Sequence, residues 1–103
     1  MKIAIASLGK KMNSILSPQA GRAPYFLIFE KEELVETWKN PFSVGGGGVG
    51  PAVARVLAEK QVEQVLVSEM GPKMQAALAE KEIDFQEMEE DTVKNVLNKV
   101  INK

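Results

Sequence analysis

The chain has 103 residues, of which 45% are hydrophobic and 26% are charged, and its net charge is −1. These values are typical of one globular domain, and they provide no general attraction to nucleic acid or to an anionic membrane. Because the chain contains no cysteine and no histidine, thiolate or imidazole metal ligation and Ser-His or Cys-His catalysis are excluded. We therefore expect a single cytoplasmic domain, residues 1–103, that binds neither nucleic acid nor a membrane.

The first half of the chain has the pattern of a strand, a loop and a hairpin. Met1–Leu8 is short and mostly apolar, which predicts a buried strand. Residues 7–23 are polar and irregular and are expected to form a long loop. Tyr25–Phe29 is aromatic and apolar throughout, as in a central strand. Leu34–Lys39 alternates between apolar and polar residues, which indicates a half-exposed strand at the sheet edge.

The second half alternates between helices and strands. Helices are expected over Pro51–Lys60 and Pro72–Glu82, and each begins with a proline that follows a glycine. A strand is expected over Val62–Val67, and a shorter strand over residues 83–88. A third helix follows Asp91 or Thr92, because apolar residues recur there at helical spacing: Val93, Val96, Leu97, Val100 and Ile101.

This order of elements predicts an α/β domain with a mixed five-stranded sheet and about three helices. The right-handed crossover rule gives the strand order 3-2-1-4-5, with the second strand antiparallel to the others. The same order is found in ribonuclease H-like folds. The carboxyl ends of strands one, three and four then share one rim, where ligands of open α/β sheets commonly bind. The first strand carries no Asp or Glu, which argues against a metal-dependent nuclease.

A run of glycines precedes the first predicted helix and is the best candidate for a binding site: Gly45, Gly46, Gly47, Gly48 and, after Val49, Gly50. Backbone N–H groups at a helix N-terminus favour bound negative charge. The run also satisfies the G-x-G-x-x-G pattern of dinucleotide-binding proteins, which any glycine run does. Dinucleotide binding is a minority alternative, because a charged edge strand precedes the run and the chain is too short for the complete fold.

Three segments together resemble the dinitrogenase iron–molybdenum cofactor biosynthesis family: residues 17–26, the glycine run, and residues 70–72. The sequence Gly-Arg-Ala-Pro-Tyr-Phe, which begins at Gly21, is the most specific part, and the resemblance covers essentially the whole chain. It implies a small carrier-like domain with the ribonuclease H-like motif fold. In nitrogen fixers, relatives bind iron–sulfur cofactor precursors or the finished cofactor. Many members carry His at the position of Gln19 and within the glycine loop, where this chain has none.

Four cations and the glycines of the rim could form an anion site. The cations are Lys10 and Lys11 in the long loop, Arg22 before the second strand, and Lys73 at the start of the second helix. Gly71 precedes that helix and completes the candidate set. The alternative is that the lysines are solvated surface charges and that Arg22 pairs with Glu69 to hold the rim together. Met70 is a candidate soft ligand on the same rim.

We therefore expect a non-catalytic binding domain whose partner is a small anionic ligand or a metallocluster. The resemblance makes an iron–sulfur or iron–molybdenum type cluster possible, while the residues leave the cofactor and any metal ligands unknown. The alternative is a protein-interaction or regulatory module, in which the rim or the exposed hairpin edge binds another protein. An enzyme is the third choice, because the sequence offers no candidate general base beyond Glu69.

Overall fold

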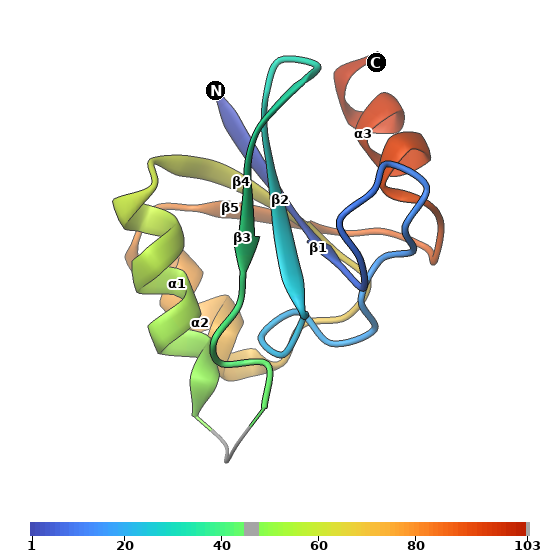
Figure 1. Cartoon of the computed structure of the whole chain (residues 1–103). Helices are drawn as coiled ribbons and strands as arrows, with labels where there is room; N and C mark the ends of the chain where they lie inside the picture. Colours follow the sequence, from blue (N-terminus) through green and yellow to red (C-terminus); the bar gives the residue numbers. More distant parts are fainter. Residues whose placement is uncertain (45–47, 103) are drawn as a thin grey trace.

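The computed structural model describes residues 1–44 and 48–102 (Figure 1). The five strands are β1 (Lys2–Ser7), β2 (Tyr25–Glu30), β3 (Glu33–Lys39), β4 (Val62–Val67) and β5 (Asp84–Glu87). The three helices are α1 (Val49–Glu59), α2 (Pro72–Glu80) and α3 (Val93–Ile101). None of the helices in the described ranges has the length and apolar composition required to cross a bilayer.

The strands form one sheet in the order β3-β2-β1-β4-β5. Strand β2 is antiparallel to both of its neighbours, whereas β4 pairs in parallel with β1 and with β5. The predicted fold class, strand order and orientations are therefore confirmed. Because β1, β3, β4 and β5 point the same way, their carboxyl ends share one rim of the sheet.

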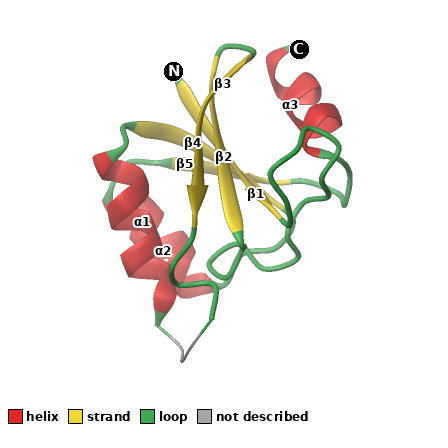
Figure 2. Cartoon of the chain, viewed as in Figure 1, coloured by secondary structure: helices red, strands yellow, loops and turns green. Residues whose placement is uncertain are grey.

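The sheet is covered on both faces, so the domain has three layers (Figure 2). Successive residues of β1 alternate between two cores: Ala4 and Ala6 face α1 and α2, while Ile3 and Ile5 face α3. The small residues of β1 thus lie on the face that carries two helices. Strand β2 is also buried on both faces, which explains why its sequence is apolar without alternation.

Several element boundaries differ from those expected from the sequence. Helix α1 begins at Val49, two residues before Pro51, because Gly48 supplies the left-handed turn (φ 80°) from which the helix starts. Helix α2 does begin at Pro72, so the two Gly-Pro pairs occupy different helical positions. It ends at Glu80, before a turn in which Glu82 has φ 59°. Strand β1 ends at Ser7, and Leu8 is exposed.

The N-terminal turns of α1 and α2 are in close contact. A Cβ atom on Gly50 would lie 2.9 Å from Met74 Cβ and 3.0 Å from Met74 Cα. Gly50 is buried in the first turn of α1, and Met74 is buried in the first turn of α2. The two helices are so close that only glycine fits at position 50 without a shift of α2. This contact brings the N-termini of both helices to the same part of the rim.

We predict that Gly50→Ala destabilises the protein, although alanine normally gains about 0.5–1 kcal/mol over glycine within a helix. The added methyl group must displace the backbone of α2, and such overpacking typically costs about 1–3 kcal/mol. Gly71→Ala is the control, because a Cβ atom there meets no other atom within 4 Å. Urea denaturation measures both variants. A Gly50→Ala protein as stable as the wild type would show that the contact is not tight.

Helix α3 is capped by side chains, unlike α1 and α2. Thr92 is the N-cap residue and its hydroxyl accepts a hydrogen bond from the Asn95 N–H at 3.2 Å. Asp91 accepts hydrogen bonds from the Asn95 side chain at 2.9 Å and from the Thr92 N–H at 2.7 Å. These two bonds, with a smaller contribution from Lys99, lower the pKa of Asp91 below its ordinary value. The sequence had left the cap open between Asp91 and Thr92, and both residues contribute.

The lowered pKa of Asp91 predicts a stability contribution that depends on pH. It is complete above the ordinary aspartate value of about 4 and is lost as the pH falls through the lower value of the folded protein. We expect Asp91→Asn to be less stable than the wild type at about pH 7, with the difference shrinking at about pH 3. Urea midpoints at both pH values test this, with Glu90→Gln as the control. A difference that is the same at both pH values would contradict the prediction.

Candidate functional site

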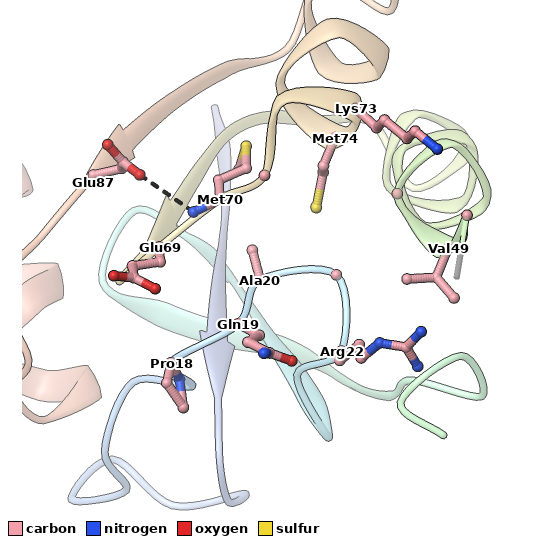
Figure 3. Close-up of a pocket in the computed structure, with 14 residues that line it drawn as sticks. Pro18, Gln19, Ala20, Arg22, Val49, Glu69, Met70, Lys73, Met74 and Glu87 are labelled. Atoms are coloured by element: carbon pink, nitrogen blue, oxygen red, sulfur yellow. Dashed lines mark hydrogen bonds between the residues drawn. The ribbon is translucent and has the colours of Figure 1, made fainter. Parts of the chain in front are cut away.

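A pocket of about 610 Å³ opens at the rim formed by the carboxyl ends of the strands (Figure 3). The segments that line it are distant in sequence: residues 18–22 before β2, residues 48–50 at the start of α1, residues 69–71 between β4 and α2, Lys73 and Met74 in the first turn of α2, and Glu87 at the end of β5. This pocket therefore lies at the predicted rim.

One buried amide holds the segment that carries Arg22. The side chain of Asn40 is 2% exposed, and its Nδ2 donates hydrogen bonds to the carbonyl oxygens of Gly21 at 3.0 Å and Ala23 at 2.9 Å. Its Oδ1 accepts a hydrogen bond from the Phe42 N–H at 3.0 Å. Asn40 thus fixes the backbone on both sides of Arg22. The sequence alone did not predict this role, because the partners of Asn40 lie 17 and 19 residues away.

Two helices begin at the pocket without a side-chain cap. Gly48 precedes α1 and Gly71 precedes α2, and neither helix has a capping hydrogen bond from a side chain or an acidic residue in its first turn. Their N-terminal N–H groups therefore give the rim a partial positive charge. Gly71 has extended backbone angles and open space around it, so neither conformation nor packing requires glycine there.

The structure brings together some of the predicted site residues and separates others. Arg22, Gly48, Gly50, Gly71 and Lys73 all line the pocket. Gly50 also packs against α2, as described above. The remaining glycines of the predicted site lie outside the described residues: Gly45, Gly46 and Gly47.

Lys10 and Lys11 are not among the residues that line the pocket. The Lys10 ammonium lies 5.6 Å from the centre of the Tyr25 ring, where a cation–π contact accounts for its position. The Lys11 N–H donates to Ser14 Oγ at 3.0 Å. Both lysines belong to a loop that is hydrogen-bonded to the start of α3, because Val93 N–H donates to the Ser14 carbonyl. The sequence could not show that this loop folds toward α3.

Two carboxylates line the pocket as well. Glu87 accepts a hydrogen bond from the Met70 N–H at 3.2 Å through Oε2, and Glu69 lies next to Met70 at the end of β4. Glu87 was not among the site residues predicted from the sequence. The available signal was its position at the end of a strand parallel to β4. Figure 3 shows Arg22 directed away from Glu69, on the other side of the pocket, in contrast to the pairing considered above.

Two methionines form part of the pocket wall. Met70 is 7% exposed and Met74 is 4% exposed, so both belong to the core as well as to the pocket. Thioether sulfur is a soft ligand, whereas no group of three His, Cys, Asp or Glu side chains that could hold a metal ion is found within residues 1–44 and 48–102. The residues therefore suit a bound group that is held by charge, N–H groups and thioethers.

Comparison with known proteins gives a consistent result. The family model described as "Dinitrogenase iron-molybdenum cofactor" matches residues 1–103. No curated protein sequence matches the chain. Among solved structures, the apo form of the orange protein from Desulfovibrio gigas is 26% identical, with a TM-score of 0.89, and the alignment covers 98% of this chain and 87% of that one.

A NifB-like protein of the DUF35 family from Thermotoga is 28% identical, with a TM-score of 0.84 and the same coverage, 98% of this chain and 87% of that one. A dinitrogenase-like protein from Methanocaldococcus jannaschii is 18% identical over 99% of this chain and 88% of that one. Its TM-score of 0.67 supports the fold alone. Because the family model covers the chain from end to end, this protein belongs to the dinitrogenase iron–molybdenum cofactor family.

Proposed function

We propose that this protein is a non-catalytic carrier that binds a small anionic ligand or an anionic metallocluster in the rim pocket. The observation that carries the proposal is that two uncapped helices, α1 and α2, begin at one pocket whose wall also holds Arg22 and Lys73. Helix N-termini and charged donors of this kind bind anions through N–H groups and charge, without a covalent ligand.

The residues of the pocket favour binding over catalysis. The described lining includes no Ser, Thr, Tyr, Cys or His side chain, so it offers no hydroxyl, thiol or imidazole for nucleophilic catalysis. The solved structure from Desulfovibrio gigas is described as an apo form, a term for a protein that also has a ligand-bound state. The family description, which names an iron–molybdenum cofactor, supports a cargo of this kind.

A metallocluster in this pocket would be held without cysteine or histidine. The N–H groups at the starts of α1 and α2 would face its anionic surface, and Arg22 and Lys73 would balance its charge. The thioethers of Met70 and Met74 would line the side of the cluster nearest the core. Because every one of these contacts is reversible, such a site suits a protein that receives a group and later releases it.

We predict that sulfate, and an anionic thiolate-ligated iron–sulfur cluster added anaerobically, bind at this pocket. In an NMR titration the amides of residues 48–50, 71, 73 and 74 should shift, and the bound cluster should add visible absorbance and iron to the purified protein. Lys73→Gln and Arg22→Gln should each weaken sulfate binding by roughly tenfold, because each removes a charge-assisted contact.

Lys10→Gln and Lys11→Gln are matched controls, because they make the same charge change away from the pocket and should leave the affinity almost unchanged. Thermal unfolding of each variant verifies that the fold is retained. If neither sulfate nor the cluster shifts the amides of residues 48–50, 71, 73 and 74, the carrier proposal fails. The protein-interaction alternative, with the exposed edge of β3 as its docking surface, would then be the better explanation.

A further inference from the structure

The charged side chains of the pocket are divided between its two sides. Figure 3 shows Arg22 and Lys73 on the side of α1, and Glu69 and Glu87 on the opposite side. We call these the basic end and the acidic end of the pocket. The division is a property of the fold. The basic end is built from residues before β2 and at the start of α2, whereas the acidic end is built from Glu69 after β4 and from Glu87, the last residue of β5.

The acidic end is held in place by backbone hydrogen bonds. The Glu87 carboxylate accepts from the Met70 N–H at 3.2 Å. The Glu69 carbonyl accepts from the Ala20 N–H at 3.1 Å, which fixes the backbone from which the Glu69 side chain extends. The Met70 N–H points at the rim and would otherwise be a donor for a bound anion. In this structure the Met70 N–H is already hydrogen-bonded to the Glu87 carboxylate.

The middle of the pocket carries no charged side chain. Ala20, Met70 and Met74 lie there, and Figure 3 shows the neutral amide of Gln19 between Glu69 and Arg22 and the Met74 sulfur directed toward the space between the two ends. The Met70 carbonyl is occupied by a hydrogen bond from Gln75 Nε2 at 3.0 Å, so it offers little to a ligand. A ligand that fills the pocket therefore meets cations, then an uncharged surface of thioethers, Ala20 and the Gln19 amide, and then carboxylates.

We propose that the pocket selects a ligand with opposite charges at its two ends, an anionic group at Arg22 and Lys73 and a positive centre at Glu69 and Glu87. The inference rests on the proposed binding function and narrows the class of ligand. An anion that spans the whole pocket would be repelled by both carboxylates, whereas a ligand with a positive centre would bind them. That centre is either a protonated nitrogen or a metal ion of the ligand.

The test compares matched probes by NMR at constant ionic strength. An ω-aminoalkanesulfonate series of increasing chain length supplies both charges with nitrogen as the positive centre. The alkanesulfonates and alkylammonium ions of the same lengths supply one charge each. Sulfate titrated with and without Mn²⁺ supplies both charges with a metal as the positive centre, and Mn²⁺ broadens nearby amides, here those of Met70 and Glu87.

We expect one aminoalkanesulfonate length, or sulfate with Mn²⁺, to bind roughly tenfold more tightly than the corresponding anion alone. A preference for an aminoalkanesulfonate identifies the positive centre as a protonated nitrogen, and a preference for sulfate with Mn²⁺ identifies it as a metal ion. The double variant Glu69→Gln/Glu87→Gln should lose the preference and should bind the simple anions more tightly than the wild type does. Glu59→Gln, an exposed carboxylate at the end of α1, is the control and should keep the preference.

Each result decides between defined alternatives. If simple anions shift the pocket amides as strongly as the bipolar probes, and the double variant does not change this, then the inference is wrong and the anion-carrier function stands. If Mn²⁺ binds equally well with and without sulfate, the two ends do not bind one ligand together, and the inference is also wrong. If no probe and no cluster shifts the pocket amides, the proposed function fails, and the inference fails with it.

Discussion

The pocket depends on the contact between the backbone of Gly50 and the first turn of α2. The sheet places the start of α1 and the start of α2 on one rim, but topology alone does not set the distance between them. The absence of a side chain at Gly50 lets Met74 approach until an added Cβ would be only 2.9 Å away. The same approach carries the Met74 sulfur to within 3.6 Å of an ideal Cβ position on Gly21. One close helix contact thus joins two walls of the pocket to the core.

The third wall is fixed by a different interaction, the hydrogen bonds of Asn40. Residues 18–22 form no helix or strand, and a loop of this kind would ordinarily have to be ordered when a ligand binds. The buried amide of Asn40 and the bond between Ala20 and Glu69 supply that order in the free protein. The backbone around Arg22 is therefore organised before binding, so that less of the binding free energy is spent on ordering the loop.

The sequence predicted the helices and strands, because these depend on local patterns of residues. It did not predict positions that are set by contacts between residues distant in sequence. Burial of β1 and β2 on both faces is visible as apolar runs, and the crossover rule converts their order into the observed sheet. By contrast, Lys10 and Lys11 were predicted as cations of the rim site, and they are not among the residues that line this pocket, because their loop is hydrogen-bonded to the start of α3. Glu87 was missed because its place in the pocket depends on the pairing of β5 with β4, which brings residues from two separate segments together. The start of α1 was misplaced because Pro51 is a familiar first residue, whereas the left-handed Gly48 is what begins the helix.

The distribution of charge in the pocket has a consequence for how it would recognise a ligand. Its two cations are balanced by two carboxylates, so the lining as a whole carries no net formal charge. Long-range attraction scales with net charge and is screened by salt, whereas matched charges at contact distance are screened much less. Selection in this pocket would therefore arise after the ligand has entered, from how well its own charges match the two ends. Abundant simple anions such as phosphate could interact with only the basic end and would compete weakly, which a carrier in a cell rich in phosphate requires.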